Sequence, residues 1–289
     1  MSAPATPTIL DRILADVQEE VTDAKSLRSE AELRGMTADA PPVRPLDAVL
    51  ESSFGLIAEI KACSPSVGPM RAQNVAEAPR AYEESPVVRA LSVLTNERHF
   101  GGSMERLREI RSLVSKPVLR KDFIICEYQI REARAFGADA VLLMASVLDA
   151  ARLRGFHELA LELGMEALFE VHDEEEVVAL PSTARIVGIN SRRFKAPEES
   201  AGFAAVGGQG SSEKDFSIRL DTFALVDRLP AGIIRVAESG LDAGNIASVR
   251  GRFHAALVGT SLLRDSSGIR VGLTAFERAL ANNRDPDHP

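Results

Sequence analysis

The chain has 289 residues, of which 45% are hydrophobic and 26% are charged. It is long enough to bury a large core, and its composition is that of an ordinary globular protein. Its formal net charge of −8 argues against nucleic acid as the main partner, because phosphate backbones attract basic surfaces.

The two cysteines, Cys63 and Cys126, lie far apart and lack the CxxC spacing of a zinc site. We therefore expect no metal site, no disulfide framework and a reducing, cytoplasmic setting. The first residues contain neither a basic region nor an apolar run, and no long uncharged apolar stretch follows. We expect neither a signal peptide nor a membrane span.

Residues 8 to about 35 are predicted to form one helix, which opens an N-terminal helical extension over residues 8–45. Apolar residues recur there at helical spacing, with charged residues between them: Leu10, Ile13, Leu14, Val17, Val21 and Ala24. Asp39-Ala40-Pro41-Pro42 then ends the pattern. We expect this extension to pack on a larger domain.

Eight short apolar runs follow, and most of them precede a helix-like stretch such as Gln129–Phe136 or Leu153–Leu163. Such alternation indicates parallel strands buried on both faces. About eight units in roughly 230 residues predict an α/β fold, a single (β/α)8 TIM barrel spanning residues 1–289. An open doubly wound sheet is the alternative, but no G-x-G-x-x-G follows the first strand. The predicted strands are Leu56–Ile60, Ala90–Leu94, Pro117–Leu119, Ala138–Met144, Glu166–Val171, Arg185–Ile189, Ile233–Val236 and Ala255–Val258.

Two segments do not fit the barrel rhythm. Residues 196–215, after the sixth strand, are rich in Gly, Ser, Ala and charge, and we interpret them as a long inserted loop. The simpler interpretation gives the loop no function, and the alternative makes it a lid, since it would emerge from the catalytic face. Residues 282–289 are predicted to be a frayed tail.

In a barrel, active groups lie at the C-terminal ends of the strands and in the loops that follow. Polar residues follow the predicted strands at six such places: Glu59-Ile60-Lys61, Arg120-Lys121-Asp122, Glu170, Asn190-Ser191-Arg192, Glu238-Ser239-Gly240 and Gly259-Thr260-Ser261. Polar groups from six strands therefore converge on one face.

Several of these residues also have simpler structural interpretations. Glu59 and Lys61 point the same way along a strand and could form a buried ion pair, while Lys121 could be an exposed lysine. Arg120 is expected in a core ion pair without a catalytic role. A carboxylate at Glu170, after an apolar run, is costly unless it has a partner or a task. Asp173–Glu176 is expected to be a solvated helix start.

Glycine-containing turns follow the last two strands, at Gly240 and Gly259. Backbone N–H groups in such turns, with a helix N-terminus behind them, bind anions, and phosphate sites recur there in these barrels. The pair predicts a phosphate-binding site. His99 and His172 are isolated in the sequence, and we expect no metal role for either.

The motifs, taken in order, resemble those of the indole-3-glycerol phosphate synthase family. The resemblance runs from about residue 8 to residue 280 and includes the N-terminal helix. The matching segments are Ile57–Ser66, Leu91–Thr95, Phe100–Ser103, Pro117–Ile125, Tyr128–Ile130, Glu132–Arg134, Glu170–His172, Gly188–Asn190 with Arg192, Glu238–Gly240 and Val258-Gly259.

The resemblance implies a carbon–carbon lyase of tryptophan biosynthesis. Its substrate would be 1-(2-carboxyphenylamino)-1-deoxyribulose 5-phosphate, which closes to indole-3-glycerol phosphate with loss of carbon dioxide and water. No metal or organic cofactor is implied. The expected partner is this small phosphorylated substrate, not nucleic acid or membrane, and weak association with other tryptophan-pathway enzymes is left open.

The resemblance also implies roles for individual residues. Lys121 matches the general acid and Glu170 the general base, while Lys61, held by Glu59, would bind substrate and act as a second acid. Near the reacting centre and the substrate carboxylate we expect Asn190, Glu238, Ser239 and Arg192; around the anionic ends and the aromatic ring we expect Ser64, Gly240, Gly259, Thr260, Phe100, Phe123 and Leu142.

The chain departs from the family pattern at a few positions. Ala62-Cys63 follows Lys61, where the family usually has Arg-Ala, and Thr260 replaces a Glu or Ser. The insertion after Arg192 puts the position of that residue in doubt. Two other functions remain open: a different phosphate-binding barrel enzyme, such as a sugar-phosphate isomerase or epimerase, and a barrel that only binds a phosphorylated ligand.

Overall fold

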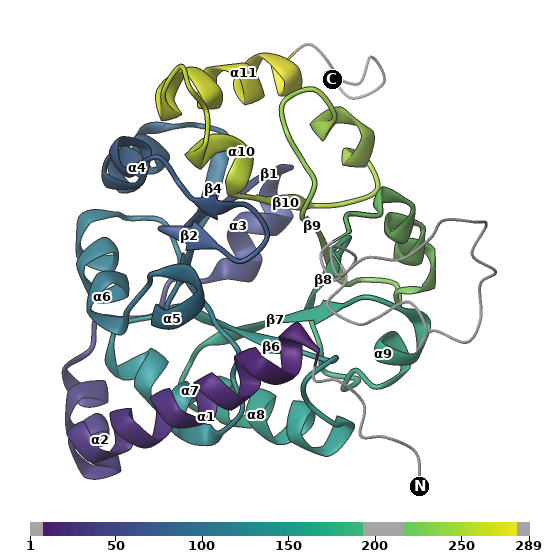
Figure 1. The fold of residues 1–289 in the computed structure, drawn as a ribbon. Coiled ribbons are helices and arrows are strands. Elements are labelled where there is room, and N and C mark those ends of the chain that lie inside the picture. The colour runs from purple at the N-terminus through teal and green to yellow at the C-terminus, as the bar shows by residue number, and fades with distance from the viewer. Residues whose placement is uncertain (1–7, 193–216, 282–289) are drawn as a thin grey trace, which may run out of the picture.

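The computed structural model describes residues 8–192 and 217–281, so the predicted insertion at 196–215 and tail at 282–289 lie outside the described residues. Eight parallel strands close into a barrel in the order β1-β4-β5-β6-β7-β8-β9-β10 (Figure 1). All eight predicted apolar runs are barrel strands, with ends within two residues of the prediction. The strands are β1 (Gly55–Ile60), β4 (Val88–Leu94), β5 (Val118–Lys121), β6 (Ala140–Met144), β7 (Glu166–Val171), β8 (Ile186–Asn190), β9 (Ile234–Glu238) and β10 (Ala255–Val258).

Helices surround the barrel (Figure 1). A small hairpin of β2 (Cys63–Ser64) and β3 (Gly68–Pro69) lies in the loop after β1. The predicted (β/α)8 TIM barrel is therefore confirmed. The helices are α1 (Ile9–Leu27), α2 (Glu30–Asp39), α3 (Leu46–Ser52), α4 (Ala72–Glu84), α5 (Glu97–Phe100), α6 (Met104–Leu113), α7 (Glu127–Ala135), α8 (Ala150–Glu162), α9 (Glu174–Val178), η3 (Leu220–Arg228), η4 (Ile246–Val249), α10 (Thr260–Leu263) and α11 (Ile269–Ala281).

The N-terminal extension over residues 8–45 contains two helices, α1 and α2, so the prediction of one continuous helix to about residue 35 was wrong. The chain becomes extended at Arg28, and Ser29 then caps a new helix. The Ser29 hydroxyl accepts a hydrogen bond from the Glu32 amide at 3.3 Å, and the Glu32 carboxylate accepts one from the Ser29 amide at 2.6 Å. This reciprocal capping box starts α2 where the apolar spacing alone suggested continuity.

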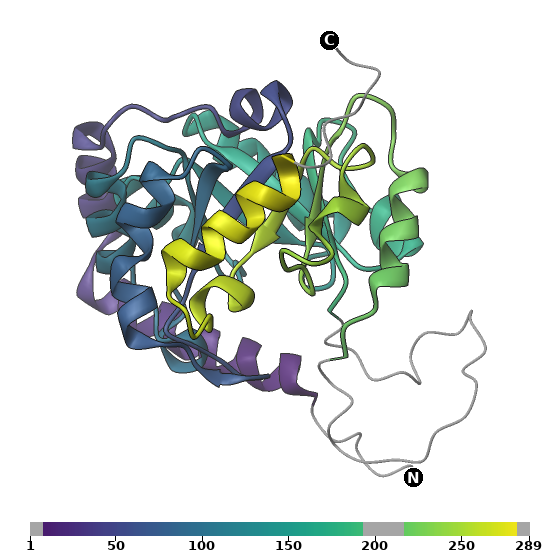
Figure 2. The same ribbon diagram turned by 90° about the horizontal axis from the view of Figure 1, so that it is seen from above.

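The chain before β1 reaches both ends of the barrel, with α1 at one end and α3 at the other (Figure 2). Helix α1 is tied to the turn after β4, where Asp16 accepts hydrogen bonds from Arg98 at 3.0 Å and pairs with His99 at 2.8 Å. The connection to α3 is fixed at the opposite end, where the Arg44 amide donates to Asp139 at 2.8 Å.

Successive side chains of each strand point alternately outward and into the barrel, so the core has two parts. Leu56, Ala58 and Ile60 of β1 pack outward against the helices, whereas Ile57 packs inside the barrel. Residues of α1 and α3 complete the inner cluster, among them the fully buried Ile13 and Leu46. Because side chains alternate, charged residues near strand ends, such as Glu59 and Glu170, project into the barrel interior above this apolar layer.

Candidate active site

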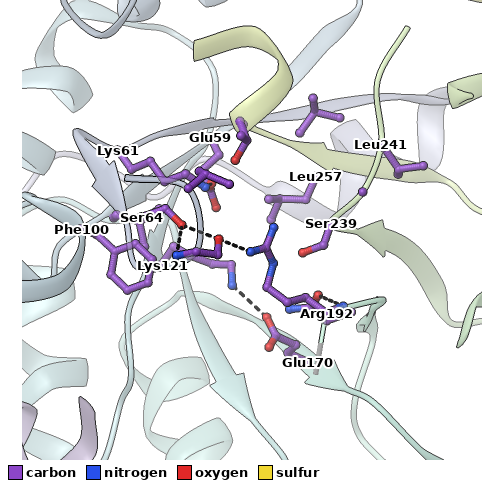
Figure 3. Close-up of a pocket in the computed structure, with 18 of the residues that line it drawn as sticks. Glu59, Lys61, Ser64, Phe100, Lys121, Glu170, Arg192, Ser239, Leu241 and Leu257 are labelled. Carbon is purple, nitrogen blue, oxygen red and sulfur yellow. Dashed lines mark hydrogen bonds and ion pairs between the residues drawn. The ribbon is translucent and has the colours of Figure 1, made fainter. Parts of the chain in front are cut away.

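A pocket of about 330 Å³ opens at the C-terminal ends of the barrel strands (Figure 3). Of the residues that the sequence predicted for the site, all but Glu238 line it. They are Glu59, Lys61, Ser64, Phe100, Lys121, Phe123, Leu142, Glu170, Asn190, Arg192, Ser239, Gly240, Gly259 and Thr260.

Lys121 and Glu170 form an ion pair across the pocket floor, and Figure 3 shows their side chains pointing toward each other. Nζ of Lys121 donates to Oε2 of Glu170 at 2.8 Å, and Glu170 has no exposed surface. Burial raises the pKa of Glu170, but Lys121 and then His172 outweigh it and hold that pKa at about 2. Burial likewise lowers the pKa of Lys121, but Glu170 and Glu238 raise it above its usual range. Both groups are charged at neutral pH.

A second ion pair joins Lys61 to Glu59, which is almost completely buried. Burial raises the pKa of Glu59, yet Lys61 and Lys121 bring it below its usual value. Glycine at position 259 makes room for this carboxylate, since a Cβ there would lie 2.5 Å from Oε1 of Glu59. The buried ion pair that the sequence allowed is thus present, and it lines the pocket.

Glu238 lies beneath the pocket instead of lining it. Its side chain is 1% exposed, and its Oε2 is 3.7 Å from Nζ of Lys121. Its carboxylate lies against Gly188 of β8. Any larger residue there would clash, because a Cβ on Gly188 would overlap this carboxylate. Burial and then the charge of the neighbouring Glu170 raise the pKa of Glu238 well above its ordinary value.

Charged groups of both signs line the pocket. The carboxylates of Glu59 and Glu170 pair with Lys61 and Lys121. The guanidinium of Arg192 is a third cation in the pocket wall, and Asp122 and Asp242 also line the pocket. The three cations can meet the negative charges of an anionic ligand.

Two left-handed residues shape the turn after β9. Ser239 has φ 69° and Gly240 has φ 71°, and a non-glycine residue in this region is uncommon. The Ser239 carbonyl accepts from the Ser191 hydroxyl at 3.0 Å, and the Gly240 carbonyl accepts from the Asn245 side chain at 2.9 Å. These bonds fix both peptide planes at the pocket edge.

Helix α10 begins next to this turn. The amides of Leu262 and Leu263 both donate to the Gly259 carbonyl, at 3.0 and 2.9 Å, so Thr260 and Ser261 occupy the first turn and line the pocket. The first amides of a helix have no partner within it. The two glycine turns predicted to bind phosphate therefore lie together on one side of the pocket.

The opposite side is apolar. The rings of Phe100 and Phe123 lie 6.4 Å apart at an interplanar angle of 32°. Leu142, together with Leu94 and Met144, extends this wall inside the barrel. A flat aromatic group would fit against these side chains.

Arg192 reaches across the pocket mouth and donates to the hydroxyl of Ser66, which also contacts Ser64 at 3.0 Å. Its own amide donates to the Asn190 side chain at 2.9 Å. The doubtful position of Arg192 is thus resolved in favour of the pocket. Ser66 was not predicted as a site residue, although it stands in the same Ser-Pro-Ser turn as Ser64. Other lining residues missed from the sequence include Pro65, Val67, Ile218, Leu241, Asp242, Leu257 and Ser261.

Arg120 and the segment Asp173–Glu176 do not line the pocket. Arg120 forms the expected core ion pairs, to Asp122 at 2.9 Å and to Glu132 at 3.0 Å. Asp173 caps α9 as a helix start should, but Glu176 is not solvated: it is 6% exposed and bonded to His172. That part of the prediction was wrong, because Glu176 turns inward toward β7.

Within residues 8–192 and 217–281, no helix is both long and apolar enough to cross a membrane. The same ranges contain no cluster of three or more His, Cys, Asp or Glu side chains that could hold a metal ion.

Comparison with known proteins agrees with this geometry. The family model described as indole-3-glycerol phosphate synthase matches residues 10–199. A Nocardioides sp. protein of that name is 39% identical over 264 residues, covering 89% of this chain and 94% of the relative. Indole-3-glycerol phosphate synthase 2 of Streptomyces coelicolor is 41% identical over 237 residues, covering 81% and 84%.

Among solved structures, 3-hexulose-6-phosphate synthase from Salmonella typhimurium matches with a TM-score of 0.54 at 12% identity, covering 80% of this chain and 100% of that one. That likeness concerns the barrel fold alone. The sequence relatives and the family model together decide the family: the chain belongs to the indole-3-glycerol phosphate synthase family.

Proposed function

We propose that this protein converts 1-(2-carboxyphenylamino)-1-deoxyribulose 5-phosphate to indole-3-glycerol phosphate, carbon dioxide and water, as a lyase of tryptophan biosynthesis acting in the cytoplasm. The observation that carries the proposal is the pairing of Lys121 with Glu170 in a pocket that also holds Lys61 with Glu59. Two acid–base pairs on facing strands suit a reaction with two separate proton transfers.

Ring closure is the first step, and it needs an acid. The aromatic carbon that bears the carboxylate attacks the sugar ketone, whose oxygen gains negative charge as the new carbon–carbon bond forms. Lys121 is the proposed general acid that protonates this oxygen. Its raised pKa keeps it protonated until the substrate is bound. Loss of carbon dioxide then restores the benzene ring.

Dehydration is the second step, and it needs a base and an acid. Glu170 is the proposed base that removes the proton from the carbon beside nitrogen, and Lys61 is the proposed acid that protonates the departing hydroxide. Glu59 would keep Lys61 in place, and Glu238 and Asn190 would act at the reacting centre. Glu170 is ionised and therefore able to accept this proton.

The remaining pocket residues suit the rest of the substrate. The phosphate would bind at Gly240, Gly259 and Thr260, with Ser64 among the polar groups nearby, whereas Ser239 would lie near the reacting centre and the substrate carboxylate. The anthranilate ring would lie against Phe100, Phe123 and Leu142. A dry wall there strengthens the charge interactions inside the pocket. Arg192 is proposed to meet the substrate carboxylate.

The direct test supplies this substrate to the purified protein in a chelated, metal-free buffer and follows the appearance of indole absorbance and fluorescence. We expect indole-3-glycerol phosphate in amounts equal to the carbon dioxide released. A folded protein that forms no product would refute the proposal. Conversion of simple sugar phosphates instead would favour the isomerase or epimerase alternative.

A further inference from the structure

A buried histidine lies directly behind the proposed base. Nε2 of His172 is 3.5 Å from Oε1 of Glu170, while the other oxygen of Glu170 faces Lys121. On its far side, Nδ1 of His172 lies 3.0 Å from Oε2 of Glu176. His172 and Glu176 are 7% and 6% exposed. A row of four side chains therefore runs from α9 through the end of β7 into the pocket: Glu176, His172, Glu170 and Lys121.

We propose that His172, held by Glu176, is a positioning residue that orients Glu170 and keeps it ionised during turnover. The inference rests on the proposed role of Glu170 as the general base. It concerns a histidine that neither ring closure nor dehydration uses directly.

The geometry favours an imidazolium at this position. Nδ1 lies within hydrogen-bond distance of Glu176 and Nε2 within ion-pair distance of Glu170, so a positive charge on the ring is favoured by a carboxylate on each side. Glu176 is itself fixed, because it also accepts a hydrogen bond from the His172 amide at 2.7 Å. The ring orientation is therefore set from the helix side.

The reaction supplies the reason for a second cation. Lys121 gives up its proton during ring closure and then no longer offsets the charge of Glu170. A fully buried carboxylate without a positive neighbour takes up a proton, because burial disfavours its charged form. His172 faces the oxygen that Lys121 does not contact, so its charge persists beside Glu170 when the dehydration step needs an ionised base.

The charged groups around His172 support this arrangement. Burial lowers the pKa of His172, but the hydrogen bond to Glu176 and the charges of Glu170, Glu176 and Asp173 raise it above its ordinary value. Among the described residues, Glu170 comes from β7 and Glu176 with Asp173 from the start of α9; Lys121 and Glu238 lie beyond Glu170. The imidazolium in turn lowers the pKa of Glu170, so its removal raises that pKa.

Two isosteric substitutions separate the two sides of the ring. His172→Asn places an amide near Nδ1 and keeps a contact with Glu176, but leaves nothing opposite Glu170. His172→Gln places a neutral amide near Nε2 and keeps a donor to Glu170 without the charge. Glu176→Gln keeps an acceptor for the His172 amide while removing the charge that stabilises the imidazolium.

The experiment measures kcat and KM for these variants across pH, with circular dichroism and melting temperature as fold controls. We expect His172→Asn to lower kcat by about 10- to 100-fold, as losses of orienting partners do, with KM within about twofold of wild type. The acid limb of the kcat profile, which reports the base in the substrate complex, should move to higher pH by about one unit. His172→Gln and Glu176→Gln should shift it in the same direction with smaller losses of kcat.

A matched control is His157→Asn. His157 is also a buried histidine, 2% exposed, on α8; it is bonded to Thr183 at 3.1 Å and packed edge-on against Phe169 at 5.1 Å between centroids. It should lower the melting temperature without moving the acid limb. If the His172 variants behave like this control, the inference is overturned while the proposed function stands. An inactive wild-type enzyme would overturn both.

Discussion

At the scale of single residues, Lys121 and Glu170 carry most of the proposed chemistry. We expect Lys121→Ala and Glu170→Gln each to lower kcat by about 10²- to 10⁴-fold, the usual contribution of a positioned acid or base. The measurement is steady-state turnover, with circular dichroism to establish that both variants fold. Near-normal turnover in both would rule out the assigned roles, and Arg12→Ala on the exposed face of α1 is the matched surface control.

For Glu238 we predict an effect on stability that depends on pH. Its pKa in the folded state is raised by burial and by Glu170, so the stability it contributes is complete below its unfolded value of 4.5 and is lost as pH rises toward the folded pKa. Glu238→Gln removes this dependence while keeping the shape. We expect the variant to melt above wild type, by a margin that widens as pH rises above 4.5, and to turn over more slowly.

Calorimetric scans of both proteins at several pH values measure this margin. A margin that is constant with pH, or a variant that melts below wild type throughout, would contradict the raised pKa. The result would then show that Glu238 is ionised and stabilised by Lys121 in the folded state.

Gly188 tests the packing that places Glu238. A Cβ at this position overlaps the Glu238 carboxylate, so Gly188→Ala must displace it. We expect a loss of about 1–3 kcal/mol in the free energy of unfolding, as overpacking of a core usually costs, together with a fall in kcat. Chemical denaturation and turnover measure the two effects. In the double variant with Glu238→Ala, the stability loss should largely disappear, and additive losses would refute the packing argument.

At the scale of elements, helix α1 both closes the inner core and supports the pocket. Ile13 is fully buried in the cluster that contains Phe123 and Leu142, and the partly buried Phe100 packs against this cluster. We expect Ile13→Ala to lower the free energy of unfolding by about 2–5 kcal/mol. Since α1 also holds the turn that carries Phe100, KM should rise as well. Urea denaturation with Arg12→Ala as the control, expected within about 0.5 kcal/mol of wild type, checks the first effect.

An Ile13→Ala variant without effect would exclude the proposed role of α1 in the core. If Ile13→Ala melts like Arg12→Ala and keeps the wild-type KM, the helix lies on the barrel without contributing to its core. The ion pairs from Asp16 and Glu19 to Arg98 would then be the main attachment, although exposed pairs of this kind contribute little.

At the scale of the whole molecule, the strand order and most of the pocket were predictable because two regularities coincide. Buried parallel strands leave continuous apolar runs, and barrel geometry brings the residues after those runs to one face. Lys61 and Asn190 follow such runs directly, and Lys121 follows its run after one residue, Arg120. The roles of these residues came from a resemblance and remain proposals, since position alone does not distinguish an acid from a structural ion pair.

What the sequence missed depended on contacts between distant segments. The depth of Glu238 follows from the missing side chain at Gly188, on a neighbouring strand. The inward turn of Glu176 follows from its bond to His172, and a row of glutamates after a strand gives no sign of it. The helix break at Ser29 was the exception, because its capping box is local and could have been recognised from Ser29 and Glu32.

The N-terminal extension also constrains how the chain matures on the ribosome. Helices α1 and α3 emerge before the barrel strands, yet their buried faces pack against residues that are synthesised later, such as Phe123 and Leu142. Asp16 bonds to Arg98 and His99, which come more than eighty residues later in the chain. Until they appear, the apolar face of α1 stays exposed and available to chaperones. Helix α1 is thus synthesised before its partners and docks only after them.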